Sequence, residues 1–537
     1  MIRPLFLTLC GLLLAPALLR ADDPLIIGGD PSVDPNDFRI TEFATGLNYP
    51  ISMAPLDDGS LLVATSRPAQ GSFFDSTGEL VRLVDANHDG VADGAPQVLY
   101  TGLVGGLTGM RRAGNLVFAT SVKAGYNGIS VLRAGATPDA PLTQLGSLDF
   151  SYPAGWSHVS FTLATRPTPG QADHYDLAFN VGSEFNATPT VGSASMSGLA
   201  SAGLQGDSIY LTTVHDTGAG VEFGAFTQIA KGLRNAAGIE FDPQSGGLVF
   251  QDNGIDGLVE SFIPLSADEL NVLPANQLGG DVEDYGFPDN YYEYKTGTFV
   301  GGKGEPSAVV FQPWPDPQTG SKSEGAFEIA IAPPDFPAGL NHGVFVGFHG
   351  NSGNANNDEN PLVYADPNTG KYFHLVSSDA PNVGHLNGLE ATQDSLFVAD
   401  MSRSGSISAG AGQGAIYQIK SLVAGLPGDV DGNLQVDLSD FGILKANFGA
   451  AAGRRQGDLT LDGKIDLSDF GVLKANFGRS QTVPEPSTWL LIISGAFALA
   501  GWRSTMLTVT RRQRCGLRLG TTRANGQRKP ARAPARQ

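Results

Sequence analysis

Short apolar strands come in pairs along most of the chain. In the clearest pair, residues 238–241 form one apolar stretch, a turn with Pro and Gly follows, and residues 248–250 form the second. Six copies of this pattern are present, and their second strands begin near Leu61, Leu116, Asp176, Leu248, Val344 and Leu396. A strand pair with one apolar face cannot bury that face alone, so the copies stack around a common axis. The pattern predicts a mainly β chain with a six-bladed β-propeller over residues 36–422.

Two further expectations concern the third copy and the ends of the repeat region. Residues 157–161 are predicted to form the first strand of the third copy. Residues 41–44 are expected to pair with residues 414–419 in the last blade, because ring closure removes the edge strands that promote aggregation. A β-sandwich with insertions is the alternative fold, and it accounts less well for six copies.

The charge balance limits the kinds of molecule that the protein can bind. The chain has 54 acidic and 34 basic residues and a formal net charge of −20, and the part from Arg503 onward is basic without any acid. Phosphate contacts need Lys and Arg, so the acidic body excludes a nucleic-acid partner. Cys10 and Cys515 lie near the two chain ends, and no disulfide framework is expected between them.

Both ends of the chain carry targeting patterns. Residues 1–21 combine an early Arg, an apolar run and a terminal Ala, which predicts a secretory signal peptide. Residues 483–514 hold Pro-Glu-Pro, an apolar run and a basic end, and they resemble the PEP-CTERM sorting signal of bacteria. The resemblance implies a C-terminal transmembrane helix until an exosortase-like enzyme processes it, and a protein of the cell envelope, the cell surface or the secreted fraction. We assign no function to the basic tail at 515–537.

An Asp- and Asn-rich turn lies within the first copy. Its oxygen-bearing residues are Asp85, Asn87, Asp89 and Asp93, and a glycine stands at position six. This spacing matches the first part of a calcium loop, although Pro96 occupies the position of the last acid. A turn in which the side chains cap their own backbone is the alternative.

Two nearly identical segments, 437–449 and 466–478, follow the propeller region. Each begins at the end of a loop whose residue types and spacing suit Ca²⁺, and each then predicts a short helix ended by glycine. On each helix a single apolar stripe is expected, formed by Phe441, Leu444 and Phe448 and by their counterparts Phe470, Leu473 and Phe477. The predicted ligands are Asp429, Asp431, Asn433, Gln435, Asp437 and Asp440 in the first loop, and Asp458, Thr460, Asp462, Lys464, Asp466 and Asp469 in the second.

The pair resembles a type I dockerin over residues 427–480, a small all-α, EF-hand-like calcium domain. The resemblance implies a cohesin-like partner that contacts Leu438-Ser439 or Leu467-Ser468, and association with cell-surface polysaccharide is a second option. The first loop has Leu434 where the sharp turn needs glycine, so the second loop is the better calcium site. A calcium-stabilised spacer without any partner is the alternative.

Several short motifs in the propeller carry another resemblance. Trp156-Ser-His158, Arg234-Asn235, 285–288 and Phe348-His-Gly-Asn are similar to motifs of the glucose/sorbosone dehydrogenase family. That family consists of secreted quinoproteins that oxidise sugars with pyrroloquinoline quinone (PQQ) and calcium. The resemblance implies that His158 is the general base and that Arg234 and Asn235 bind the cofactor. It places Asn253 on the cofactor side and Gly254 on the calcium side, and His349 and His385 stand where the family has further basic residues.

Three functions are compatible with these patterns. The first is a PQQ-dependent sugar or aldehyde dehydrogenase. The second is a non-catalytic propeller that binds carbohydrate or protein. The third is a lactonase-like calcium propeller, for which Glu240, Asp252 and Asn253 are the candidate ligands.

Overall fold

The computed structural model describes residues 25–68, 72–159, 162–258, 264–302, 304–313, 325–337, 339–349, 361–378, 384–422, 428–430, 435–449, 457, 459 and 464–480. The predicted signal peptide, the sorting signal with its transmembrane helix, and the basic tail lie outside these residues. Within the described ranges, no helix is both long and apolar enough to cross a membrane.

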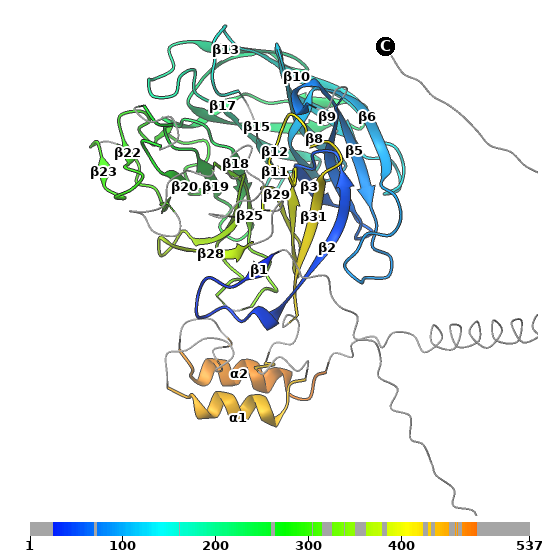
Figure 1. The fold of residues 1–537 in the computed structure, drawn as a ribbon, viewed down its shortest axis with the longest axis vertical. Coiled ribbons are helices and arrows are strands. Elements are labelled where there is room, and N and C mark those ends of the chain that lie inside the picture. Colours follow the sequence, from blue (N-terminus) through cyan, green and yellow to red (C-terminus); the bar gives the residue numbers. More distant parts are fainter. Residues whose placement is uncertain are drawn as a thin grey trace, which may run out of the picture. The chain divides into compact units, whose positions relative to one another are not determined.

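Six sheets surround a common axis (Figure 1). Each contributes one strand to an inner ring, in which every strand contacts the next and the last contacts the first. The inner strands are β3 (Ser52–Pro55), β7 (Gly106–Ala113), β11 (Leu163–Pro167), β18 (Gly238–Phe241), β25 (Ala326–Ile331) and β29 (Leu386–Ala391). The prediction of a six-bladed propeller is therefore confirmed.

The remaining strands follow outward in each blade. The second strands are β4 (Leu61–Pro68), β8 (Leu116–Lys123), β12 (His174–Val181), β19 (Leu248–Asp252), β26 (Val344–Phe348) and β30 (Ser395–Asp400). The third strands are β5 (Ser76–Leu83), β9 (Tyr126–Arg133), β15 (Ser208–Asp216), β20 (Asp268–Leu273), β27 (Leu362–Asp366) and β31 (Gly414–Ser421). The fourth strands are β6 (Gln97–Val104), β10 (Thr143–Ser151), β17 (Thr227–Lys231), β24 (Val309–Phe311), β28 (Lys371–Ser377) and β2 (Phe38–Leu47).

Short additional strands extend some of the blades or lie beside them. They are β1 (Ile26–Ile27) on the fifth sheet, β13 (Ser193–Gly198) and β14 (Ala202–Gln205) on the second, and β16 (Val221–Phe223) and β21 (Glu283–Asp284) on the third, while β22 (Tyr291–Tyr292) and β23 (Phe299–Val300) form a separate hairpin.

The first strand predicted for the third copy was wrong. That strand is β11, and residues 157–158 instead form a loop whose Ser157 and His158 N–H groups donate to the carbonyls of Glu184 and Ser183. The sequence of β11 contains Thr165 and Arg166, so it is less apolar than the segment before it. Arg166 is accommodated because it pairs with Asp176 on the adjacent strand at 2.9 Å.

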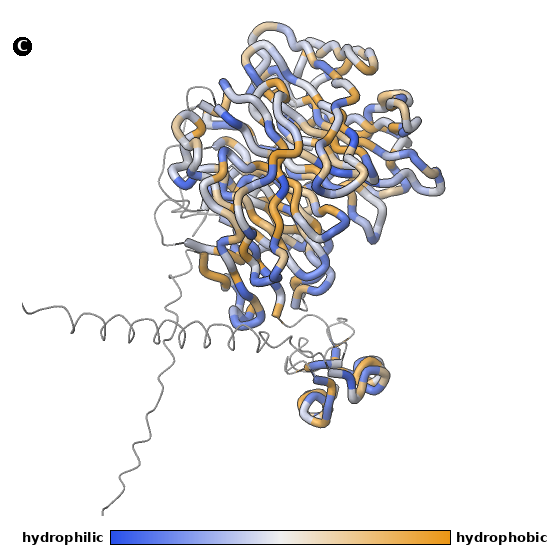
Figure 2. The backbone as a smooth tube through the Cα atoms, turned by 90° about the vertical axis from the view of Figure 1, so that its right-hand side faces the viewer, coloured by the Kyte–Doolittle hydropathy of each residue, from blue (hydrophilic) through white to orange (hydrophobic). Residues whose placement is uncertain are grey.

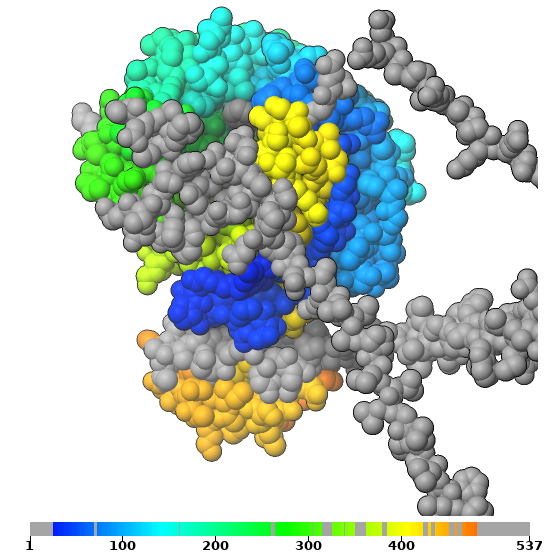
Figure 3. Space-filling view, viewed as in Figure 1, coloured from blue at the N-terminus to red at the C-terminus, as the bar shows by residue number. Residues whose placement is uncertain are grey.

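The last blade is closed by the two ends of the repeat region. Strand β2 lies antiparallel to β31, with Thr41 opposite Gln418 and Ala44 opposite Ile416. Figure 3 shows the early part of the chain, in blue, beside the late part, in yellow. The expected pairing of residues 41–44 with 414–419 is confirmed, and the ring has no open seam at this blade.

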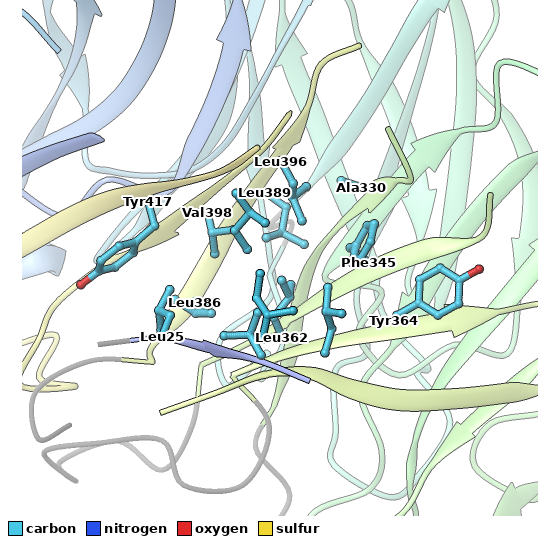
Figure 4. Close-up of a cluster of buried hydrophobic side chains, with 14 of the residues drawn as sticks. Leu25, Ala330, Phe345, Leu362, Tyr364, Leu386, Leu389, Leu396, Val398 and Tyr417 are labelled. Atoms are coloured by element: carbon cyan, nitrogen blue, oxygen red, sulfur yellow. The ribbon is translucent and has the colours of Figure 1, made fainter. Parts of the chain in front are cut away.

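The core consists of apolar layers between neighbouring blades. Between the fifth and sixth blades, Phe345, Leu362, Leu386, Leu389 and Val398 are buried together (Figure 4). Figure 2 shows the same preference along the chain, with hydrophobic strands inside and hydrophilic turns at the periphery. Complete burial of one such side chain stabilises the fold by about 1.5–3 kcal/mol, so the interfaces between blades account for much of its stability.

The segment after the propeller contains the helices α1 (Leu438–Ala446) and α2 (Leu467–Asn476). Both begin with a capping box, formed by Asp437 with Asp440 and by Asp466 with Asp469. Their shared core is made of Val430, Val436, Leu444, Ile465 and Leu473.

The predicted apolar stripe on these helices was partly wrong. Leu444 and Leu473 are buried, but Phe448 and Phe477 are 50% and 51% exposed. Both phenylalanines follow the last helical residue, so they no longer lie on the helical face.

Candidate functional site

The residues that carry the dehydrogenase resemblance lie at one end of the inner ring. First and second strands of each blade are antiparallel, so the starts of the first strands and the ends of the second strands face the same side. His158, Arg234, Asn235 and His385 precede first strands, and Asn253 and His349 follow second strands. We call this end of the channel the His158 mouth.

His158 is held as a neutral imidazole with a defined tautomer. Its Nδ1 lies 2.8 Å from Ser183 Oγ and 3.2 Å from the Ser183 carbonyl oxygen. The Ser183 hydroxyl donates its own proton to the Phe185 carbonyl at 2.6 Å, so both atoms near Nδ1 are acceptors. Nδ1 therefore carries the proton and Nε2 has a free lone pair. Burial, assisted by the charge of Arg234, lowers the pKa of His158 to about 4.

Arg234 is buried and already has an acidic partner. Its Nη2 donates to Asp256 Oδ2 at 2.5 Å and to Asn186 Oδ1 at 2.8 Å, and Nε donates to the same Asn186 oxygen at 3.1 Å. None of its hydrogen bonds to the described residues uses Nη1. The Arg234 guanidinium is thus oriented and largely neutralised, with one nitrogen left for a ligand.

Asn235 places an unsatisfied oxygen beside His158. Its Nδ2 donates to Asn253 Oδ1 at 3.0 Å, and Asn253 Nδ2 donates to the Ala326 carbonyl at 2.7 Å. Asn235 Oδ1 is buried and has no hydrogen-bond partner among the described residues. A Cβ atom on Gly182 would lie 2.7 Å from His158 Cβ and 3.3 Å from Asn235 Oδ1, so Gly182 separates the two side chains.

The buried side chain of Asp252 holds the backbone of Arg234 and Asn235 in place. Its carboxylate accepts the backbone N–H groups of Arg234 at 2.9 Å and of Asn235 at 2.6 Å. Burial raises the pKa of Asp252 to about 7, against the opposing effect of these two hydrogen bonds. Gly254, predicted on the calcium side, donates its N–H to Asp268 Oδ1 at 2.7 Å. The supporting role of Asp252 was not predicted, because it depends on backbone contacts that no motif encodes.

A small cavity lies beside Arg234. That cavity measures about 20 Å³ and is lined by Arg234, Asn253 and Gly254 but not by His158. It is close to the volume that one water molecule needs. A cavity of this volume is too small to hold a sugar.

His349 and His385 form a second group at this mouth, with ring centroids 5.6 Å apart. His385 Nδ1 lies 2.6 Å from the His349 carbonyl oxygen, and His349 Nδ1 lies 3.0 Å from Asn387 Oδ1. Burial lowers the pKa of His349. These histidines occupy the positions at which the motif resemblance implies further basic residues.

The turn at residues 85–93 caps its own backbone. Asp85 accepts the N–H groups of Asp89 and Gly90, Asn87 accepts that of Asp89, and Asp93 accepts that of Ala86. In the described part of the chain no group of three or more His, Cys, Asp or Glu side chains is placed to hold a metal ion. Calcium at this turn stays a prediction, and the contacts match the alternative of a plain turn.

An aspartate at the end of each dockerin-like loop connects the loop to its helix through hydrogen bonds. Asp440 accepts the N–H groups of Val430 at 2.6 Å and Asp437 at 2.7 Å. Asp469 accepts those of Leu459 and Asp466, both at 2.8 Å. Asp429, Gln435 and Lys464 also belong to the described residues, whereas Asp431, Asn433, Asp458, Thr460 and Asp462 lie outside them.

The three residues proposed as calcium ligands of a lactonase-like site do not lie together. Glu240 Oε2 accepts from Arg111 Nε at 3.1 Å inside the channel, whereas Asp252 and Asn253 belong to the His158 mouth. The group around Arg111 was not predicted, because its members are far apart in the sequence and form no motif.

Several solved structures resemble the chain at low similarity. No family model and no curated protein matches the chain. Among solved structures, a calcium structure of the Trichoderma reesei carbohydrate-active enzyme family AA12 is similar at 16% identity, covering 75% of this chain and 98% of that chain, with a TM-score of 0.47. The holo form of the pyranose dehydrogenase PQQ domain from Coprinopsis cinerea has 15% identity, coverage of 74% and 97%, and a TM-score of 0.44. The PQQ-bound aldose sugar dehydrogenase from Streptomyces coelicolor has 17% identity, coverage of 71% and 98%, and a TM-score of 0.44. Values this low assign no activity to the chain.

Proposed function

We propose that the protein is an oxidoreductase that oxidises a hydroxyl group of a sugar at the His158 mouth. The observation that carries this proposal is the neutral His158 with a free Nε2 lone pair, next to the unsatisfied Oδ1 of Asn235. Both atoms are hydrogen-bond acceptors, so they favour a ligand that presents hydroxyl protons.

The residues of this mouth suit the removal of a hydroxyl proton. Oxidation of an alcohol to a carbonyl releases one proton and one hydride. His158 Nε2 accepts the proton, and Ser183 holds the imidazole so that Nε2 faces the ligand. PQQ, which the motif resemblance implies, supplies the two-electron acceptor when bound.

The residues of the His158 mouth suit the quinone end of PQQ but not its carboxylates. Arg234 Nη1 and the Asn235–Asn253 pair would hold its quinone end, with a calcium ion near Gly254 as the resemblance implies. PQQ also has three carboxylates, and of the residues placed at this mouth only Arg234 is cationic. We therefore expect weak PQQ affinity.

The test is a titration of the full chain with PQQ and excess calcium, followed by turnover of aldoses with a dye acceptor. His158→Ala should lower turnover by roughly 10²–10⁴-fold and leave PQQ affinity nearly unchanged. Since the pKa of His158 is about 4, native turnover should stay constant as the pH falls from neutral and decrease only as the base becomes protonated. Absence of saturable PQQ binding by a folded protein would leave the carbohydrate- or protein-binding propeller as the function.

We further propose that the helical pair binds two calcium ions and serves as an assembly module. Support comes from the repeated capping boxes and from Leu438 and Leu467, which are 73% and 74% exposed at equivalent positions. Exposed apolar residues at two matching places suit a cohesin-like protein partner, with cell-surface polysaccharide as the other candidate.

Export and sorting complete the proposal. A signal peptide at 1–21 would direct export, and the PEP-CTERM-like segment at 483–514 would hold the chain in the membrane until an exosortase-like enzyme processes it. The protein would then reside in the cell envelope, at the bacterial cell surface or in the secreted fraction. Mass spectrometry of the mature chain tests both cleavages.

A further inference from the structure

The channel has a second mouth on the opposite side of the ring. There the ends of the inner strands surround a cavity of about 1100 Å³, and all six blades contribute to its wall, through Pro55, Arg112, Thr165, Glu240, Ala332 and Glu390. We call it the Arg111 mouth. It is separate from the His158 mouth, and a ligand bound there is independent of the proposed oxidation.

A buried arginine forms the floor of this cavity. Arg111 is 6% exposed; its Nε donates to Glu240 Oε2 at 3.1 Å, and its Nη1 donates to Glu328 Oε1 and, at 3.1 Å, to Ser52 Oγ. The other oxygen of Glu328 accepts the Leu389 N–H at 3.1 Å. The floor is thus fixed by contacts from five different inner strands.

One donor of this floor is left without a partner. Arg111 Nη2 is buried and has no hydrogen-bond partner among the described residues, and Arg111 lines the cavity. A buried unsatisfied donor costs about 1–3 kcal/mol or more, so a ligand that supplies an acceptor here gains that amount. Glu390 lies in the same wall, and burial raises its pKa well above the usual range, so it can donate as well as accept.

The charges of this mouth disfavour an anionic ligand. Arg111 pairs with the carboxylates of both Glu240 and Glu328, which outnumber it even when Glu390 is protonated. The two other arginines of the wall are neutralised, since Arg112 pairs with Asp57 at 2.8 Å and Arg166 pairs with Asp176 at 2.9 Å. Among the described residues of the wall, every arginine is paired with a carboxylate, so none is left to bind a phosphate or a carboxylate of a ligand.

Apolar residues make up much of the wall. It includes Pro55, Pro167, Phe241, Pro334 and Leu389. A large cavity with apolar walls and a few convergent donors and acceptors is typical of a small-molecule site. Sugars combine the two properties required here, because their hydroxyl groups both donate and accept while their C–H faces pack on apolar walls. We propose that the Arg111 mouth binds the end of a neutral saccharide chain.

The experiment is isothermal calorimetry of the full chain with cellotetraose and with maltotetraose, each with and without EDTA. Saturable binding of at least one tetrasaccharide is expected, unchanged by EDTA. Glu390→Leu should weaken it at least tenfold, and Gln244→Trp, an exposed residue in the wall, should weaken it by obstructing the entrance. Gln205→Trp, an exposed residue outside this wall, is the matched control and should bind normally, and His158→Ala tests the other mouth.

Three results would overturn the proposal. The first is no saturable heat with either tetrasaccharide. The second is binding that survives both Glu390→Leu and Gln244→Trp but is lost in His158→Ala, which would move the saccharide to the other mouth. The third is calcium binding that Glu390→Leu abolishes and that excludes the tetrasaccharide, which would make this mouth a cation site.

Discussion

At the residue scale, Ser183 determines which nitrogen of His158 carries the proton. Because the Ser183 hydroxyl already donates to the Phe185 carbonyl, it can only accept from Nδ1. Ser183→Ala removes this closer acceptor and leaves only the Ser183 carbonyl at 3.2 Å, so we expect the tautomer protonated at Nε2 to gain population and sugar turnover to fall by about tenfold. ¹⁵N chemical shifts of the labelled His158 ring measure the tautomer directly.

A matched control exists in the same blade. Ser208 is also buried, and its hydroxyl donates to the Gly206 carbonyl without contacting His158. Ser208→Ala should therefore leave the ring shifts of His158 unchanged. Equal tautomer shifts in both variants would show that the effect arises from general loosening of the blade.

A second prediction concerns the neutralised guanidinium of Arg234. Asp256 is 68% exposed, so Asp256→Asn should cost little stability, about 0–1 kcal/mol, while it frees a positive charge for an anionic ligand. We expect tighter PQQ binding, by about tenfold, in a fluorescence titration with calcium present. Asp284→Asn, which removes a similarly exposed partner of Lys231 at 3.4 Å, should have no effect. Weaker binding in Asp256→Asn would mean that Asp256 mainly keeps Arg234 in position.

At the element scale, the helical pair depends on two buried acids that connect loop and helix. Asp469 accepts the Leu459 N–H through Oδ1 and the Asp466 N–H through Oδ2, so Asp469→Asn keeps an acceptor oxygen for only one of them and removes the charge that a calcium ion requires. We expect calcium affinity of the second loop to fall more than tenfold while the helix persists without calcium. Calorimetric calcium titration and circular dichroism of the full chain measure the two effects.

Ser468→Ala is the control for this prediction, because Ser468 is exposed and its hydroxyl bonds only Asp466 among the described residues. If the native chain shows no calcium-dependent heat, the calcium assignment of these loops fails as a whole. If Asp469→Asn instead melts α2 at saturating calcium, Asp469 acts chiefly as a helix cap.

The elements also show what the sequence can and cannot reveal. Strands such as β19 and β26 were predictable because both of their faces are buried between blades, which produces continuous apolar runs. Strand β11 was missed because Arg166 interrupts the pattern, and its partner Asp176 is visible only in the folded sheet. The His158 mouth was found through motifs, whereas Arg111 and Glu328 contact each other across 217 positions of sequence and left no local signal.

At the scale of the whole molecule, the ring is closed by β2. Deletion of residues 38–47 should leave β31 as an exposed edge, so we expect association of chains and a lower unfolding temperature. Light scattering coupled to size-exclusion chromatography measures the association. Deletion of residues 25–30, which removes only the outer strand β1 of the fifth sheet, is the control and should leave the association state of the full chain unchanged. A protein that does not associate after loss of residues 38–47 would contradict the closure argument.

The pairing of β2 with β31 also sets an order of events during synthesis. Strand β2 leaves the ribosome before the other strands of its blade, yet its partner at Gly414–Ser421 emerges more than 360 residues later. Contacts so distant in sequence form slowly, because a long loop must close before they contribute. The first blades can assemble before β31 has been made, but the sixth cannot, and its one early strand must wait unpaired. Ring closure is therefore a late step, and it is the step at which a holding chaperone would be of most use.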